Sequence, residues 1–391
     1  MRLSSVYYAD VHAALRQALD EEGLDGFLAT APSDVAYLAG FYYAVTERPV
    51  YLWFPREGRP LCLVPQLDDE YARLQRIEAD IATYAEFPGV VPAERVLARE
   101  VASRGRPPAR IGVSGGLTLA AHAALTSALS GAELVTSGVV ARLRLTKHPE
   151  ELAWHRQAAG ICDEMLAAGR SLIEDALRSG GPLPSEGDLA RHVIGYGTDA
   201  MYQRYDHVIY TTKLAGALVY AGPNSAHPHG LPSRRRLRDG DTVILSLGAA
   251  VGSRFVESER TFVIGEPSAG QRRYFAAAAE AQEVGTAGLR AGRTCAEVNR
   301  ECLDVIRGHG LGEYIRHRQG HGIGVQNHEP PWVEDGDATV LRAGMVLSSE
   351  PGVYVPGHGG YRVSDTVLVT ESGQERLTGY PRGLEENVIA P

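Results

Sequence analysis

Apolar positions between residues 11 and 24 recur at the spacing of one helix face, and this periodicity predicts an amphipathic helix. Three apolar runs predict strands at residues 26–30, 50–54 and 60–64, and a turn that contains proline and glycine separates the last two. Strand-like and helix-like patterns keep alternating until about residue 140. The alternation predicts an α/β N-terminal domain, which we place at residues 1–143.

The pattern changes after residue 143. Thr146 and the carboxylates of Glu150 and Glu151 predict the start of a helix that runs towards residue 172. Two more helical patterns, at residues 271–287 and 296–309, alternate with short runs of Val, Ile and Thr. Those runs predict strands at residues 242–247, 256–264, 345–349 and 361–368. Glycine and proline turns between the strands are typical of antiparallel hairpins, so residues 144–391 are predicted to form an α+β domain.

Composition narrows the class of protein. Of the 391 residues, 44% are apolar and 22% are charged, as in ordinary globular proteins. The net charge of −9 offers no general basic surface, so neither nucleic acid nor membrane is expected as a partner. The sequence has no apolar run of the ~18 residues needed to span a bilayer and no apolar signal segment at its start. The four cysteines form no Cys-x-x-Cys pair, so free thiols and a cytoplasmic location are expected.

Two carboxylates in the second half, Glu259 and Glu350, suit a chemistry that needs no metal. A pair of carboxylates can accept bidentate hydrogen bonds from a planar cationic group such as a guanidine or an amidine. His229, which follows a proline shortly before the strand predicted at residues 242–247, can take a proton from water and return it to a leaving nitrogen. Taken alone, Glu259 would equally suit an ion pair with a neighbouring arginine, and Glu350 would suit the cap of a turn.

Residues 320–330 place His321 in the run Gly-His-Gly-Ile-Gly, and His328 follows seven residues later. This segment resembles the active-site strand of the pita-bread hydrolases, the M24 peptidase and creatinase family, which includes methionine aminopeptidase, aminopeptidase P, prolidase and creatinase. The resemblance covers essentially the whole chain. It implies an α/β N-terminal domain followed by an α+β pita-bread (creatinase/aminopeptidase) domain, and it implies that His229 shuttles protons or contacts the substrate.

Most members of this family hold two metal ions with five side chains, and three of those five positions differ here. Ser246 replaces the first aspartate, Glu257 replaces the second, and Ser364 replaces the bridging glutamate. Two divalent ions at close range repel each other and need bridging carboxylates, so the pair is not expected to bind. One ion held by Glu257, His321 and Glu350 remains conceivable. The favoured interpretation is a metal-free site with no cofactor.

The altered positions resemble creatinase, which is metal-free. Creatinase has a serine at the place of Ser246, and its two substrate carboxylates match Glu259 and Glu350. In the N-terminal domain, Tyr43 and Arg48 resemble the loop that supplies an arginine for the substrate carboxylate. In the family's dimers this loop reaches into the partner's active site, so the resemblance implies a homodimer in which Arg48 acts on the neighbouring subunit.

Other positions depart from creatinase and argue against creatine as the substrate. Glu257 is acidic where creatinase is small and apolar. Residues 329–335 lack the second arginine that creatinase uses to hold the substrate carboxylate, and Trp332 can reshape that wall of the site. Arg362 can take over the contact, or it can form a structural ion pair with Asp365 or Glu350.

We therefore expect a metal-independent hydrolase of a C–N bond in a small zwitterionic amidine, guanidine or cyclic amide. The predicted catalytic residues are His229, Glu259, His321, His328 and Glu350. The predicted substrate-binding residues are Tyr43, Arg48, Glu257, Trp332 and Arg362. Three alternatives stay open: a lyase or cyclase that uses the same acid and base groups, an inactive binding protein on this fold, and a Xaa-Pro peptidase with one metal ion.

Overall fold

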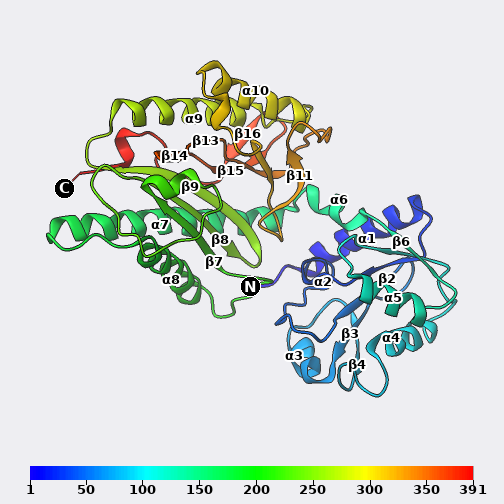
Figure 1. Ribbon diagram of the computed structural model, residues 1–391. Coiled ribbons are helices and arrows are strands. Elements are labelled where there is room, and N and C mark those ends of the chain that lie inside the picture. Colours follow the sequence, from blue (N-terminus) through cyan, green and yellow to red (C-terminus); the bar gives the residue numbers. More distant parts are fainter. Residues whose placement is uncertain (391) are drawn as a thin grey trace. The chain divides into compact units, whose positions relative to one another are not determined.

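Residues 1–390, which the computed structural model describes, divide between two units that each bury a core of their own (Figure 1). One unit comprises Arg2–Arg144, and the other runs from Leu145 onward and includes Met1. The four cysteines are buried as free thiols. None of the described helices combines the length and the apolar character that a membrane crossing requires.

The first unit is built on a six-stranded mixed sheet with the order β4-β3-β2-β1-β5-β6. Its strands are β1 (Gly26–Ala29), β2 (Tyr51–Pro55), β3 (Leu61–Pro65), β4 (Asp80–Tyr84), β5 (Arg110–Val113) and β6 (Glu133–Thr136). Its helices are α1 (Ser5–Glu21), α2 (Pro32–Ala39), α3 (Asp69–Leu74), α4 (Ala93–Ala102), α5 (Leu119–Ala128) and α6 (Val139–Leu145). β1 pairs in parallel with β5 and antiparallel with β2, which agrees with the predicted α/β class.

Helix α1 begins six residues earlier than its apolar pattern indicated. Ser4 caps it, because the Ser4 side chain accepts a hydrogen bond from the Tyr7 amide. Tyr7 and Tyr8 add two buried aromatic side chains to the first turns. The periodicity that starts at residue 11 therefore captured only the later part of the buried helix face.

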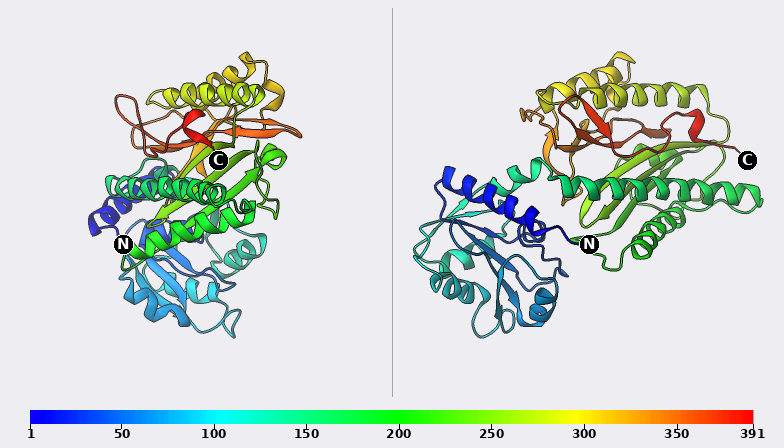
Figure 2. Two further views of the ribbon diagram at one scale, coloured as in Figure 1. Left: turned by 90° about the vertical axis from the view of Figure 1, so that its left-hand side faces the viewer. Right: turned by 180° about the vertical axis from the view of Figure 1, so that it is seen from behind.

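The second unit contains three sheets. Its strands are β7 (Ala215–Ala221), β8 (Thr242–Val251), β9 (Arg254–Ile264), β10 (Gly320–Gly322), β11 (Glu329–Val333), β12 (Val346–Ser349), β13 (Gly352–Val355), β14 (Gly359–Arg362), β15 (Asp365–Val369), β16 (Gln374–Arg376) and β17 (Val388–Ile389). Their orders are β17-β9-β8-β7, β11-β10-β12-β15-β16 and β13-β14. Its long helices are α7 (Pro149–Arg178), α8 (Glu186–Arg204), α9 (Ala269–Gly288) and α10 (Cys295–Gly308). The views in Figure 2 show α7 and α8 against β7–β9, and α9 and α10 on the side of β11–β14.

Helix α7 starts three residues after the predicted start. Thr146 is not its cap, because this residue instead forms a β-bridge with Met345. His148 caps the helix, and the side chain of Glu151 accepts a hydrogen bond from the His148 amide at 3.0 Å to complete a capping box. The carboxylates of the first turn therefore mark the helix start more accurately than the threonine does.

The strand predicted at residues 361–368 is wrong as a single element. The chain pairs with β13 as β14 up to Arg362, and it joins the larger sheet as β15 only from Asp365. Ser364 lies between the two strands and forms a separate β-bridge with Glu259. The sequence pattern does not show this change of sheet, because both strands are buried along their whole length.

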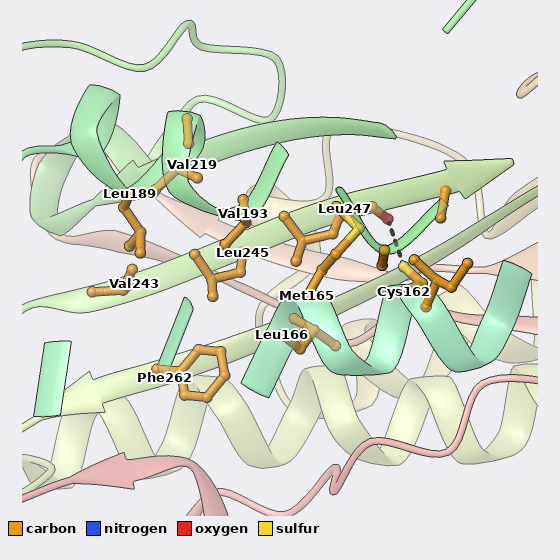
Figure 3. Packing of buried hydrophobic residues seen from close by; sticks show 14 of the residues in the cluster. Cys162, Met165, Leu166, Leu189, Val193, Val219, Val243, Leu245, Leu247 and Phe262 are labelled. Atoms are coloured by element: carbon orange, nitrogen blue, oxygen red, sulfur yellow. Dashed lines mark hydrogen bonds between the residues drawn. The ribbon is translucent and has the colours of Figure 1, made fainter. Parts of the chain in front are cut away.

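An apolar core covers one face of the sheet formed by β7–β9. Leu245 and Leu247 of β8 pack against Met165 and Leu166 of α7, and Val193 of α8 closes the cluster (Figure 3). Because successive side chains on a strand point to opposite faces, burying this face in apolar contacts commits the other face to a different environment. That other face forms the floor of the candidate site.

Residues 378–389 tie the end of the described chain to the same sheet. The guanidinium of Arg260 on β9 donates hydrogen bonds to the carbonyl oxygens of Tyr380 and Pro381. Asp365 accepts hydrogen bonds from Arg260 at 2.8 Å and from Arg382 at 2.6 Å. β17 then pairs in parallel with the far end of β9. The tail is therefore an integral part of the sheet.

Candidate active site

The floor of the site consists of two rows of residues that cross strands β7, β8 and β9. Register pairing aligns the rows, and the alternation along each strand puts them on the face opposite the apolar core. The two rows are Leu218, Ser246 and Glu259, and Gly216, Gly248 and Glu257. Gly216 and Gly248 have no side chains that would fill the space above the sheet. Glu257 and Glu259, the last residues of the two rows, each supply a carboxylate.

The opposite wall comes from four other segments. His321 lies on β10, His328 immediately precedes β11, Glu350 follows β12, and Arg362 ends β14. Floor and wall enclose a cavity of about 200 Å³. The side chains of this wall and its rim that line the cavity are Lys213, His229, Asn327, His328, Glu350 and Arg362.

Glu259 is buried and held by two partners. The Ser246 hydroxyl donates a hydrogen bond to Glu259 Oε1. The Arg362 guanidinium forms an ion pair with Glu259 Oε2, with Nε at 2.5 Å. Burial raises the pKa of the Glu259 carboxyl, and the positive charge of Arg362 opposes the rise. The structure therefore contains an ion pair of Arg362, but the partner is Glu259 rather than the predicted Asp365 or Glu350.

Glu257 lies at the end of the glycine row. Its Oε1 accepts a hydrogen bond from the Ser364 hydroxyl at 3.2 Å, and its Oε2 lies 3.6 Å from His321 Nε2. Burial, reinforced by the negative charge of Glu350, raises the pKa of the Glu257 carboxyl. Arg254 is not its partner, because the Arg254 guanidinium pairs with Glu151 at 2.8 Å.

His321 presents a single ring nitrogen to the carboxylates. Its Nδ1 lies 3.0 Å from the Gly322 carbonyl, which can only accept, so Nδ1 carries a proton. Its buried Nε2 has no hydrogen-bond partner and lies 3.3 Å from Glu350 Oε1. Burial alone would lower the pKa of His321, but the carboxylates of Glu257 and Glu350 overcome that effect and raise it to about 9.

His328 completes a group of possible metal ligands. Its ring stacks on that of His321 with centroids 3.8 Å apart. Burial and the neighbouring charge of His321 lower the pKa of His328 to about 4, so its ring is neutral at pH 7. Ligand atoms of Glu257, His321 and His328 all lie within 4.8 Å of one another.

These residues fit one metal ion and do not fit two. The orphaned Nε2 of His321, with Nδ1 directed at a carbonyl, is the arrangement of a ligand histidine. A second ion would need bridging carboxylates, but Ser246 and Ser364 offer hydroxyls at those positions. The guanidinium of Arg362 already supplies a positive charge at Glu259. The sequence predicted that Glu257, His321 and Glu350 could hold a single ion. The structure instead groups His328 with Glu257 and His321.

His229 reaches the cavity from the loop that follows β7. It lies on the exposed rim, and Tyr220 positions the loop by donating a hydrogen bond to the Pro228 carbonyl at 2.7 Å. The neighbouring His227 is exposed and does not line the cavity. Four of the five predicted catalytic residues therefore line one cavity: His229, Glu259, His328 and Glu350. The fifth, His321, is not among the lining residues and lies beside Glu257 and Glu350. Their roles stay predictions.

Trp332 is not among the residues that line the cavity. It pairs in register with His321 across β10 and β11, and the Arg318 guanidinium stacks over its ring at 4.5 Å. Arg318 also pairs with Glu334 at 3.0 Å. Arg318 and Trp332 therefore contact each other outside the cavity lining.

Tyr43 and Arg48 belong to the first unit. The Tyr43 ring stacks on that of Phe41, with centroids 4.9 Å apart. The Arg48 guanidinium pairs with Glu86 at 2.6 Å and with Glu47. The predicted entry of this loop into a partner's active site stays a prediction.

Sequence reasoning missed two polar residues of the cavity, Lys213 and Asn327. Asn327 lies inside the histidine motif at 320–330, so the motif alone did not distinguish it from its neighbours. Lys213 carried a compositional signal, because Lys147 and Lys213 are the only lysines in the sequence.

Comparisons with known proteins agree with this architecture. Residues 153–371 match the model of metallopeptidase family M24, and residues 12–146 match that of the creatinase/prolidase N-terminal domain. The probable dipeptidase PepE of Mycobacterium tuberculosis is 30% identical over 98% of this chain and 97% of its own. The Xaa-Pro dipeptidase of Pyrococcus furiosus is 34% identical over 63% of this chain and 66% of its own. The structure of the Xaa-Pro dipeptidase from Bacillus anthracis is 30% identical, with a TM-score of 0.84 over 98% of this chain and 100% of that one.

These findings confirm the predicted fold, an α/β N-terminal domain followed by an α+β pita-bread domain. They overturn the predicted function. A metal-independent, creatinase-like hydrolase of an amidine, guanidine or cyclic amide is wrong, because relatives that match nearly the whole chain are named dipeptidases and Xaa-Pro dipeptidases. The prediction gave the two serines too much weight and did not include His328 among the residues that could hold a metal ion.

Proposed function

Because the chain belongs to metallopeptidase family M24, we propose that it is a dipeptidase that cleaves small peptides with the help of one divalent metal ion. The observation that supports this most directly is the convergence of Glu257, His321 and His328 within 4.8 Å. Two imidazoles and one carboxylate form a ligand set of catalytic zinc sites, and they suit other divalent transition metals as well.

When bound, the ion supplies Lewis acidity towards the carbonyl of the scissile peptide bond. The side chains of the cavity perform the proton transfers. Glu350, beside His321 and in contact with the cavity, takes a proton from the attacking water. His229, on the rim, delivers a proton to the leaving amine. Arg362 and Ser246 hold Glu259 in place in the floor throughout the reaction.

Metal analysis combined with a dipeptide panel tests this proposal. Protein purified without chelator is expected to contain about one divalent ion per chain and to hydrolyse dipeptides, including some with proline in second position. Chelation is expected to abolish hydrolysis, and adding the ion back is expected to restore it. A fully active protein without bound metal, or a stoichiometry of two, would contradict the proposal.

Variants of two neighbouring histidines supply the matched control. His328→Ala removes a proposed ligand and is expected to lower metal occupancy and turnover by roughly 10²-fold, as for the loss of a group that orients or binds the metal. His227→Ala removes an exposed histidine that does not line the cavity, so metal content and turnover should stay unchanged. Equal losses in both variants would argue that the site tolerates no nearby change and would remove His328 from the ligand set.

The homodimer implied by the family's N-terminal loop is also part of the proposal. Light scattering is expected to find a dimer, and Arg48→Ala is expected to raise KM more than it lowers kcat. A monomer with full activity would exclude a role for Arg48 in a partner's site.

A further inference from the structure

Lys213 is an unusual residue for this chain. Of the 39 basic residues counted as Lys or Arg, only Lys147 and Lys213 are lysines. Lys147 is a structural residue, because its side chain is 2% exposed and its Nζ pairs with Glu329 at 3.0 Å. Lys213 is exposed, and no described acidic side chain forms an ion pair with it. It is therefore a cation with charge available for a ligand.

The geometry directs this charge into the active-site cavity. Lys213 lines the cavity just before β7 begins. Its side chain folds back over Gly216, because a Cβ atom on Gly216 would lie 2.8 Å from Lys213 Nζ. Gly216 belongs to the floor row that ends in Glu257. The absence of a side chain at residue 216 thus makes room for the ammonium group within the cavity wall.

The remaining cations near the cavity are already paired. Arg362 is buried against Glu259 at 2.5 Å, and Arg318 pairs with Glu334 at 3.0 Å. The deep part of the cavity carries the carboxylates of Glu257, Glu259 and Glu350. The lining is therefore negative at the inner end of the rows and positive at Lys213, a distribution complementary to a zwitterion.

We propose that Lys213 binds the terminal carboxylate of the substrate and so restricts this site to peptides that end within the cavity. The assignment rests on the proposed dipeptidase function and adds a specificity residue to it. The volume agrees: about 200 Å³ is available, against roughly 300–1,000 Å³ in pockets for drug-sized ligands. A dipeptide with free amino and carboxyl termini is the substrate class of this size and charge.

Kinetics on matched substrates test the proposal. Lys213→Gln is expected to raise KM about tenfold for a dipeptide with a free carboxylate, in line with the loss of one hydrogen bond to a charged group. It should leave kcat and metal content unchanged. The same dipeptide with a C-terminal amide lacks the carboxylate, so wild type and Lys213→Gln should show equal KM for it. Lys213→Arg, which keeps the charge, should recover most of the loss.

The outcomes are decisive in both directions. An equal rise in KM for acid and amide, or no change for either, overturns the role of Lys213 while leaving dipeptide hydrolysis established. Arg178→Gln serves as the control for losing one surface charge, because Arg178 lies at the end of α7 with its side chain 71% exposed. It should match the wild type on both substrates.

Lysine-specific labelling gives a second measurement that needs no turnover. Because Lys147 is buried, acetic anhydride should modify Lys213 and the N-terminal amine, which mass spectrometry resolves. A dipeptide analogue whose peptide carbonyl is reduced to CH2 is expected to slow acetylation of Lys213 several-fold. The same analogue with a C-terminal amide in place of the carboxylate should not slow this acetylation. The N-terminal amine of the protein should be acetylated equally in every sample.

Absence of protection by the acid analogue, at a concentration that saturates its binding in calorimetry, overturns the assignment, as does equal protection by the amide. If the wild type fails to hydrolyse dipeptides but the acid analogue still protects Lys213, the proposed function fails and the carboxylate site stands.

Discussion

The ion pair between Arg362 of the wall and Glu259 of the floor joins the two sides of the site. Both are buried, with side chains 3% and 5% exposed, so neither charge can return to water if its partner is removed. Arg362→Met is expected to lower the free energy of unfolding by roughly 3–5 kcal/mol, since it leaves an uncompensated buried carboxylate. Chemical denaturation of wild type and variant at pH 7 measures the loss.

The double variant Arg362→Met/Glu259→Gln separates charge from packing. Removing both charges should restore much of the lost stability, because no isolated charge stays buried. If the double variant is as unstable as the sum of the two single variants, the ion pair does not account for the effect.

His155 on α7 predicts an acid-sensitive stability. Its Nδ1 donates to the Phe255 carbonyl at 2.8 Å, while its buried Nε2 has no hydrogen-bond partner. Burial, followed by the positive charges of Lys147 and Arg254, lowers its pKa to about 3, although Glu329 opposes the shift. Below pH 6.5, the ordinary pKa of histidine, His155 therefore binds a proton in the unfolded chain but not in the folded protein.

The contribution of His155 is fully present above pH 6.5 and is lost as the pH falls towards 3. Over that window the free energy of unfolding should fall by about 1.4 kcal/mol per pH unit from this residue alone. His155→Asn should remove this component, so the wild type and the variant should differ in slope between pH 6.5 and pH 5. Parallel curves would show that His155 is not the responsible group.

The sequence predicted that the residues on family motifs lie in one site. It did not predict which of these residues form hydrogen bonds or ion pairs with one another. Glu257, His321 and Glu350 stand at matching motif positions, so a shared site followed from the sequence. The partner of Arg362 depends on where β14 ends and the chain changes sheet, which the local pattern does not encode. Lys213 has no motif at all.

At the level of elements, the β8–β9 hairpin depends on one glycine. Gly252 has a φ of +55°, and a Cβ atom there would lie 2.0 Å from the Trp154 ring. Gly252→Ala should therefore combine a left-handed backbone cost of about 1–2 kcal/mol with an overpacking cost of roughly 1–3 kcal/mol. Thermal unfolding should show a clear loss of stability.

Gly240→Ala is the matched control for the backbone cost. Gly240 has a φ of +79°, but nothing lies within 4 Å of a Cβ atom there. It should lose only the backbone contribution. Equal losses in the two variants would mean that Trp154 moves aside and that the hairpin is less tightly packed than its geometry indicates.

The helices and strands that the sequence predicted could be recognised because their periodicity reflects burial of one face or of both. The starts of α9 and α10 lie within two residues of the predicted ones, and β8 and β9 contain the predicted strands. The failures at α1, α7 and residues 361–368 share a cause. Caps and changes of sheet are decided by single hydrogen bonds or by tertiary pairing, and neither alters the apolar period.

For the whole molecule, the division into two units predicts where metal binding resides. All three proposed ligands belong to the unit that begins at Leu145, and this unit buries its own core. A fragment of residues 145–391 is therefore expected to fold and to bind one divalent ion. Circular dichroism and metal analysis of the purified fragment check the prediction. An unfolded or metal-free fragment would contradict it.

The fold was predictable from the whole chain, whereas the reaction was not. Family motifs extend over both units, so the architecture followed from many positions at once. The reaction depends on a few side chains, and Ser246 and Ser364 showed only that two carboxylates common in the family are absent. His328 becomes a ligand candidate only when its ring is seen stacked on that of His321.

The attachment of residues 378–389 to β9 has a consequence for how the protein is made. Tyr380, Pro381 and Arg382 engage Arg260 and Asp365 behind the strand that carries the two floor carboxylates. The ribosome adds these residues after every side chain that lines the cavity. The strand that carries the floor carboxylates therefore gains its contacts with Tyr380, Pro381, Arg382 and β17 only at the end of synthesis.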